Sequence, residues 1–225
     1  LRRLSLDLVG LLPSQQQIEQ FVANPSDDAY LQLVDQLLAS PHFGERWGRH
    51  WMDVWRYSDW DGFKNQLRGS QRHIWRWRDW IVSSLNRDKG YDQMIVEMLA
   101  GDEIAPNDPA VLPATGFLAR NFNSNNRNLW LDAPVEHTAK ALLGLTLNCT
   151  RCHDHKYDPF TQREFYELFA YFNQTPVTGA GGNPQTAPTL TVLSSEAKKE
   201  ITERQERVDV HEHQLGELAR KLLSG

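Results

Sequence analysis

Apolar residues recur at helical spacing along most of the chain, and serine, proline, asparagine and glycine separate the apolar runs. Ser40 followed by Pro41 has the order of N-cap and proline that is favoured at helix starts, and Thr161 with Glu164 forms a capping box. The pattern predicts seven helices before residue 175, with the approximate limits 13–24, 26–38, 40–54, 74–85, 91–101, 132–147 and 161–172. We therefore expect a mostly α fold, an irregular multi-helix domain with long loops.

The predicted helix over 40–54 carries a histidine on its apolar face. The residues that share this face are Phe43, Trp47, His50, Trp51 and Val54. Because an apolar helix face usually packs against the core, we expect these side chains to point inward. Seven of the eight tryptophans lie between Trp47 and Trp80, which indicates either a Trp-rich core or an aromatic wall around a flat group.

Two stretches have no helical period. The first, 59–70, is polar, and the second, 102–128, is rich in proline, asparagine and glycine. The second is longer than the roughly 12–15 residues usual for structureless connections, and such loops are often functional. The carboxylates of Asp59, Asp61, Asp102 and Glu103 are weak candidates for acid–base groups, and they lack the spacing of a calcium loop.

The composition changes after residue 175. Residues 176–194 are predicted to be a linker with a short strand at 189–193, and residues 195–225 a charged helix. One heptad position of this helix is apolar throughout: Ile201, Val208, Leu215 and Leu222. The companion core position is half polar: Arg204, His211 and Leu218. This pattern indicates either the start of a helical hairpin or coiled coil with a partner helix, or a solvated helix on its own domain. The part of the chain before this linker, 1–175, is predicted to form one helical domain.

The composition is that of a globular protein with a packed core. The chain has 225 residues, of which 40% are hydrophobic and 24% charged. The net charge of −5 gives no reason to expect nucleic acid or an anionic membrane as partner. No apolar run reaches the roughly 18 residues of a membrane span, so we expect no membrane insertion in this segment. The chain opens at Leu1 in ordinary structured sequence, and we expect it to be a piece of a longer protein.

The strongest chemical signal is the segment from Cys149 to His153, whose C-x-x-C-H spacing is that of covalent c-type haem attachment. Two thiols three positions apart can add to the two vinyl groups on one edge of the porphyrin. His153 then becomes the proximal ligand of the iron. The chain has only these two cysteines, Cys149 and Cys152. The sequence therefore predicts one haem c.

Three other interpretations of the cysteine pair are weaker. A structural zinc site needs four ligands, and beyond Cys149, Cys152 and neighbouring histidines the chain offers no second cysteine pair. A redox C-x-x-C motif of the thioredoxin kind lies at a strand-to-helix turn, whereas the run before Cys149 is helical in pattern. The third interpretation is a pair of inert buried cysteines that a histidine follows by chance.

The same residues carry a family resemblance. The motifs are FGERWGRHWMD at 43–53, YDQ at 91–93 with LAGD at 99–102, and LGLT at 143–146 followed by CTRCHDHKYDP at 149–159. Over roughly residues 1–175 the chain resembles the planctomycete-type cytochrome c domain family, a domain of unknown function found inside large exported proteins. The resemblance implies a covalent haem and an extracytoplasmic setting, but it implies no reaction.

The second axial ligand is less clear from the sequence. We favour His50, because an imidazole among aromatic side chains needs a partner such as iron or a hydrogen-bond acceptor. Met94 and Met98 are alternatives by chemistry, although their helical spacing also suits a core position. His137, in the helix before the cysteines, is a further alternative. The aromatic side chains expected to pack on the haem are Trp47 and Trp51.

Charged groups crowd next to the attachment motif. Asp154, His155 and Asp158 are candidates to orient the proximal imidazole, to bond a haem propionate or to bind a second cation. A helix-capping turn at Asp158 is a simpler explanation, and we favour it over a metal. Arg151 and Lys156 are candidate partners of the propionates by their charge.

These features favour electron transfer, within a larger exported multidomain protein, to a redox partner or to other domains of the parent chain. One alternative is a haem-dependent oxidoreductase whose open distal site is formed by 102–128. The other is a structural module held by haem or by zinc. The chain has no G-x-G-x-x-G, P-loop, G-x-S-x-G or H-E-x-x-H pattern. We expect a periplasmic or other extracytoplasmic location.

Overall fold

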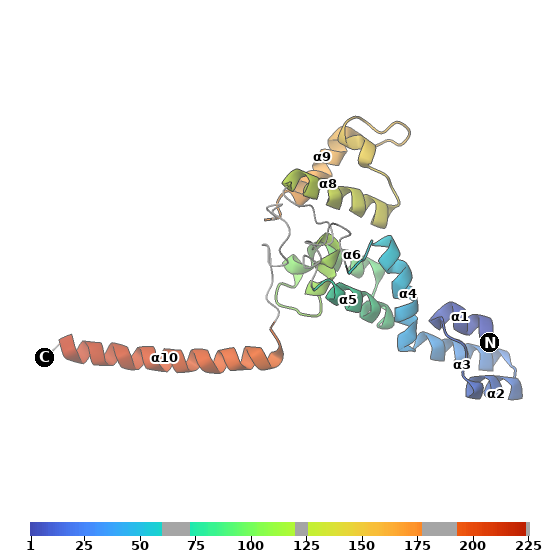
Figure 1. Ribbon diagram of the computed structural model, residues 1–225, viewed down its shortest axis with the longest axis horizontal. Coiled ribbons are helices and arrows are strands. Elements are labelled where there is room, and N and C mark those ends of the chain that lie inside the picture. Colours follow the sequence, from blue (N-terminus) through green and yellow to red (C-terminus); the bar gives the residue numbers. More distant parts are fainter. Residues whose placement is uncertain (60–72, 120–125, 177–192, 224–225) are drawn as a thin grey trace. The chain divides into compact units, whose positions relative to one another are not determined.

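The computed structural model describes residues 1–59, 73–119, 126–176 and 193–223, and within these ranges it contains helices and no strand (Figure 1). The predicted class, a mostly α fold of irregularly arranged helices, is confirmed. The chain divides into two compact units, Leu1–Thr189 and Leu190–Gly225. The strand predicted at 189–193 falls almost wholly outside the described residues.

Three short helices open the first unit: α1 (Arg2–Val9), α2 (Gln15–Ala23) and α3 (Asp27–Leu38). Helix α1 was not expected from the sequence, and it ends at Gly10 with φ of 72°, a left-handed conformation that glycine adopts without strain. Ser14 forms a capping box at the start of α2, and Ser26 caps α3. The small core of this region consists of Val9, Leu33 and Leu37.

Helix α4 (Pro41–Val54) packs closely on α5 (Trp75–Asn86) through two glycines. Gly44 and Gly48 are buried, and a Cβ atom added to Gly44 would lie 2.5 Å from the carbonyl oxygen of Val82. The Gly44 N–H also donates a hydrogen bond of 2.8 Å to Oδ1 of Asn86. The contact between these helices therefore depends on the absence of side chains on α4.

This packing corrects the expected inward face of α4. Trp47 is 39% exposed, and His50 and Val54 are also exposed, so three of the five residues of the predicted apolar face point to solvent. The physical reason is that α4 approaches α5 along the Gly44 and Gly48 side, and the aromatic residues to one side of that contact stay outside.

Most of the described tryptophans belong to the main core, as a Trp-rich core would require. Trp55, Trp77 and Trp80 are at most 3% exposed, and Trp51 stacks on Trp55 with ring centroids 4.9 Å apart. Trp60 lies outside the described residues. The buried members of this core are Trp55, Ile74, Trp77, Trp80, Ile81, Met94, Met98, Ala114 and Phe117.

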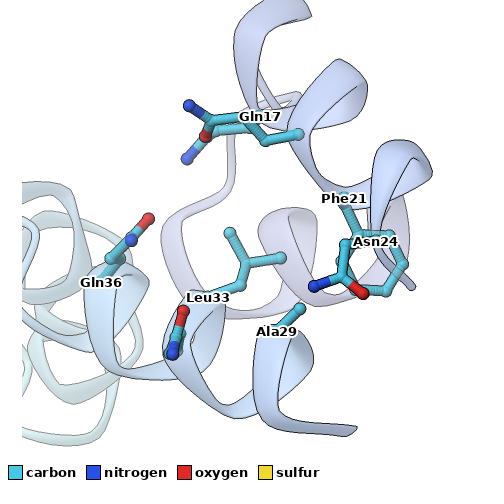
Figure 2. Close-up of a pocket in the computed structure, with 8 residues that line it drawn as sticks. Gln17, Phe21, Asn24, Ala29, Leu33 and Gln36 are labelled. Carbon is cyan, nitrogen blue, oxygen red and sulfur yellow. The ribbon is translucent and has the colours of Figure 1, made fainter. Parts of the chain in front are cut away.

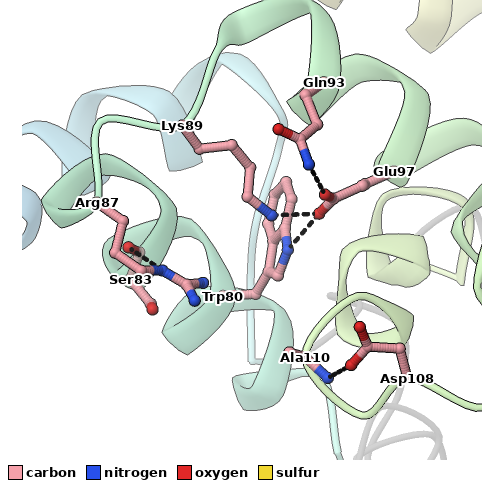
Figure 3. A network of polar contacts seen from close by, with 8 residues as sticks. All are labelled: Trp80, Ser83, Arg87, Lys89, Gln93, Glu97, Asp108 and Ala110. Carbon is pink, nitrogen blue, oxygen red and sulfur yellow. Dashed lines mark hydrogen bonds and ion pairs between the residues drawn. The ribbon is translucent and has the colours of Figure 1, made fainter.

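A buried carboxylate fixes α6 (Tyr91–Ile104) to α5. Glu97 is 2% exposed, and its carboxylate accepts hydrogen bonds from the Trp80 indole (3.0 Å) and from Gln93 (2.9 Å). It also pairs with the Lys89 ammonium, which lies 5.2 Å from the Trp80 ring centroid (Figure 3). Because three donors meet one carboxylate, the charge is well compensated inside the core.

The long loop predicted at 102–128 is partly helical. Helix α6 continues to Ile104, a 3₁₀ turn follows at Leu112–Thr115, and α7 spans Gly116–Ala119. These turns are too short to show a periodic pattern, yet they place Ala114 and Phe117 in the main core. Residues 120–125 lie outside the described ranges. Asp61, one of the candidate carboxylates, also lies outside them.

The remaining core of the first unit joins α8 (Arg127–Thr138) to α9 (Gln162–Phe172). Asn126 caps α8, which therefore begins earlier than predicted, and a π-helical turn at Ala139–Leu143 extends it to the left-handed Gly144. The capping box of Thr161 and Glu164 is present at the start of α9, as predicted. The buried residues of this second core are Trp130, Leu131, Val135, Ala139, Leu147, Phe165 and Phe172.

The second unit contains α10 (Ser195–Leu223), which confirms the predicted charged helix. Its heptad residues Ile201, Val208 and Leu215 are exposed in the structure. Among the helices described, none is long and apolar enough to cross a membrane.

Candidate functional site

The two cysteines lie on a tight turn with both thiols free and exposed. Cys149 belongs to a 3₁₀ turn, η4 (Asn148–Arg151), and Cys152 follows it directly. The Cys152 N–H donates a hydrogen bond of 3.2 Å to the carbonyl oxygen of Cys149, which closes the turn. The spacing of three residues predicts this proximity along the chain. The structure adds that both cysteines are free and exposed.

The opposite side of the same turn is buried. Thr150 is fully buried, and its hydroxyl donates a hydrogen bond of 2.6 Å to the carbonyl oxygen of Leu147, which is a member of the second core. Leu147 and Thr150 thus hold the turn on the core while Cys149 and Cys152 face outward. A rigid support of this kind suits a site that must keep two side chains in a fixed relation.

Arg151, between the two cysteines, is bound from two helices. Its guanidinium pairs with the carboxylate of Asp132 on α8 at 3.0 Å. Its carbonyl oxygen accepts hydrogen bonds from the Gln162 side chain and the Tyr166 hydroxyl on α9, both at 3.1 Å. Burial raises the pKa of Asp132 above its ordinary value, and the Arg151 charge opposes this shift. The backbone and the side chain of Arg151 therefore anchor the turn.

His153 is exposed, and one of its ring nitrogens already has a partner. The Nδ1 atom lies 2.7 Å from the carbonyl oxygen of Asp154, so the N–H at Nδ1 donates to that oxygen. This arrangement leaves Nε2 as the basic nitrogen of the neutral imidazole. A hydrogen bond from the second ring nitrogen is the usual way in which proteins orient a metal-binding histidine.

The residues after His153 stabilise the start of α9. The Asp154 carboxylate accepts a hydrogen bond of 2.8 Å from the Gln162 backbone N–H, and the His155 N–H donates to the carbonyl oxygen of Phe160 at 2.8 Å. The half-buried His155 ring accepts at Nδ1 from the Asp158 N–H at 2.9 Å. In this turn Asp154, and not Asp158 as predicted, accepts from the first turn of α9, whose N-cap is Thr161.

Lys156, which we expected by its charge to contact a propionate, is exposed beside the motif. Its ammonium lies 5.1 Å from the centroid of the Tyr157 ring, and both side chains face solvent. Across the ranges that the structure describes, no three His, Cys, Asp or Glu side chains come together as a group that could hold a metal ion.

The other predicted site residues lie on α4 and α6. Trp47 and His50 form a ring contact with centroids 5.5 Å apart on the exposed side of α4, whereas Trp51 is half-buried and packs on Tyr91. Helix α4 contacts α5 and α1, and η4 contacts α9. Because His50 is exposed, the argument that a buried imidazole needs a partner does not hold for it. Its imidazole is accessible. Met94 and Met98, on α6, are core residues, and His137 lies near the end of α8.

Three residues of the site were not found from the sequence. Asp132 lies 19 residues before Arg151, and Gln162 and Tyr166 lie 11 and 15 residues after it. No local motif links such positions, because tertiary packing alone brings them together.

Comparison with known protein families gives a match over most of the chain. Residues 1–177 match the PSCyt2 family, which is described as a protein of unknown function (DUF1549). This match agrees with the resemblance inferred from the motifs. Neither the curated proteins nor the solved structures include a match.

Proposed function

The chain belongs to the PSCyt2 family of unknown function, and from that premise we propose that it is a c-type cytochrome domain that transfers electrons within a larger exported protein. In this proposal one covalent haem is held by Cys149 and Cys152, and His153 ligates its iron. The observation that carries the proposal is the outward-facing C-x-x-C-H turn, whose two thiols are free and exposed.

The residues present fit a covalent haem by their chemistry. Thioether attachment needs two accessible thiols, and both cysteines are free and exposed. Iron ligation needs a neutral imidazole with one free nitrogen, and the hydrogen bond of His153 to the Asp154 carbonyl leaves Nε2 available. When bound, the haem would supply one-electron redox chemistry at potentials set by its second axial ligand and its surroundings.

In this proposal, other residues of the chain keep the turn that carries Cys149 and Cys152 in a fixed position. Arg151 fixes the turn to α8 through Asp132 and to α9 through Gln162 and Tyr166. Thr150 is fully buried and bonds Leu147, which belongs to the second core. A turn held on several sides changes little in geometry when the charge at its surface changes, which favours outer-sphere electron transfer. The exposure of the turn also favours close approach of a redox partner.

His50 remains our candidate for the second axial ligand, because its imidazole is exposed and lies beside Trp47. The test compares His50→Ala with His42→Ala, a second exposed histidine on the same helix that bonds Glu45. We expect a low-spin ferric spectrum that becomes high-spin in His50→Ala and is unchanged in His42→Ala. An unchanged spectrum in His50→Ala would remove His50 as a ligand.

The test of the function itself is a potentiometric titration of the chain produced with the c-type maturation machinery. We expect a reversible one-electron reduction and no dependence on a small-molecule substrate. A ferric iron that binds small exogenous ligands readily and turns over a substrate would instead support the oxidoreductase alternative. Since haem c is attached outside the cytoplasm in the resembling bacterial systems, the proposal includes an extracytoplasmic location.

A further inference from the structure

The N-terminal part of the first unit contains a second candidate site, a pocket between helices α2 and α3. Its volume is about 250 Å³. Figure 2 shows Gln17 of α2, Asn24 just after its end and Gln36 of α3 around the pocket, with Leu33 between the two helices. The complete lining is Gln17, Gln20, Phe21, Asn24, Ala29, Gln32, Leu33 and Gln36.

The polar lining consists of carboxamides alone. The Gln17 side chain is used in the capping box of α2, where it accepts from the Ser14 N–H. The other four carboxamides have no side-chain hydrogen bond within the part of the chain that the structure describes: Gln20, Asn24, Gln32 and Gln36. Each carboxamide offers two donors and one acceptor oxygen with two lone pairs. The pocket therefore offers both kinds of hydrogen-bonding group from both walls.

The lack of charge restricts the ligand. No lysine, arginine, histidine, aspartate or glutamate lines the pocket, although charged residues are the commonest choice for exposed helix positions. A phosphate, a carboxylate or a metal ion would meet no opposite charge there. The lining suits an uncharged ligand whose groups both donate and accept hydrogen bonds, as hydroxyl groups do.

The floor of the pocket is apolar. Leu33 is 6% exposed, and Phe21 and Ala29 are half-buried beside it. An aromatic and aliphatic floor with a few polar groups at the rim is the general design of small-molecule sites. Here the volume lies below the roughly 300–1,000 Å³ of pockets for drug-sized ligands. A pocket of this size and lining suits a small ligand with one apolar face and hydrogen-bonding groups at its edge.

We propose that this pocket binds one neutral sugar ring of a carbohydrate. The C–H face of the ring packs on Phe21 and Leu33, and its hydroxyl groups exchange hydrogen bonds with Gln20, Gln32 and Gln36. The proposal does not depend on the haem, because none of the lining residues belongs to the C-x-x-C-H turn or its anchors.

The experiment is an NMR titration of the full ¹⁵N-labelled chain with neutral hexoses, N-acetylhexosamines and their disaccharides. We expect at least one of these sugars to bind with a Kd in the millimolar range and to shift amide signals of α2 and α3. Gln36→Ala combined with Gln32→Ala should weaken this binding about tenfold or more, since each variant removes a hydrogen-bonding side chain. Both positions are exposed, so circular dichroism should show an unchanged fold.

The matched control is Gln16→Ala, an exposed glutamine of α2 that does not line the pocket. This variant should bind the sugar as the unchanged chain does. The proposal is overturned if no sugar of the panel shifts signals of α2 and α3. It is equally overturned if the Gln32→Ala, Gln36→Ala double variant binds with unchanged Kd.

Discussion

The buried carboxylate of Glu97 gives the sharpest stability prediction. Replacement by alanine removes the acceptor for the Trp80 indole and for Gln93, and it leaves the Lys89 ammonium, whose side chain is only 13% exposed, without a counter-charge. Removal of one partner from a buried ion pair lowers the free energy of unfolding by about 3–5 kcal/mol. This is a large part of the roughly 5–15 kcal/mol that stabilises a typical domain.

The comparison is with an ion pair on the surface. Arg163 and Glu167 on α9 are 2.9 Å apart, with side chains 86% and 57% exposed. Glu167→Ala should lower the free energy of unfolding by less than about 1 kcal/mol, because water screens an exposed pair. The two variants therefore differ in burial and in the number of donors, and only the Glu97 variant should destabilise strongly.

Urea unfolding monitored by tryptophan fluorescence measures both free energies. A double-mutant cycle with Lys89→Ala adds a second test, because groups in one buried network are not additive, with coupling energies of about 0.5–3 kcal/mol. We expect the double variant to lose less than the two single variants together. A Glu97→Ala variant as stable as Glu167→Ala would refute the conclusion that this network holds α5 to α6.

Three further predictions concern helix packing and caps. Gly44→Ala should lower the free energy of unfolding in urea by about 1–3 kcal/mol, because the new Cβ would lie 2.5 Å from the Val82 carbonyl oxygen. The control is Gly216→Ala, where a new Cβ would meet nothing within 4 Å. This control variant should increase helicity. Thr161→Ala should lower the free energy of unfolding by about 1 kcal/mol, through loss of the α9 N-cap, and an unchanged midpoint would contradict it. Hydrogen bonds from the Thr161 N–H and hydroxyl hold the pKa of Glu164 below its ordinary value of 4.5, so its stabilising effect is present above that pH and is lost as the pH falls through the lower folded-state pKa. Glu164→Gln should therefore flatten the acid side of the stability profile, and an equally steep profile would count against this pKa shift.

Local signals were enough to predict most helix starts. Ser14, Ser26, Ser40 and Thr161 each cap the helix expected after it, since an N-cap acts on backbone groups only two or three residues away. The proximity of Cys149 and Cys152 is local in the same way, because they lie three positions apart on one turn. Such features need no knowledge of the rest of the fold.

The buried face of α4 could not be predicted in the same way. Periodicity selects Trp47 and His50 because they are aromatic, whereas the face that packs is marked by Gly44 and Gly48, which carry no apolar signal. The partner of Gly44 is Asn86, which lies 42 residues further along the chain. The anchors of Arg151 were missed for the same reason, because tertiary packing brings them to the turn.

The central claim is that Cys149 and Cys152 bind haem covalently, and a pyridine haemochrome spectrum tests it most directly. The chain is produced with the c-type maturation machinery, together with a Cys149→Ser, Cys152→Ser variant and a control cytochrome, and the pigment is extracted with acid–acetone. We expect a c-type band that resists extraction in the unchanged chain and is absent from the double variant. Colourless protein from cells in which the control cytochrome matures normally would contradict the claim.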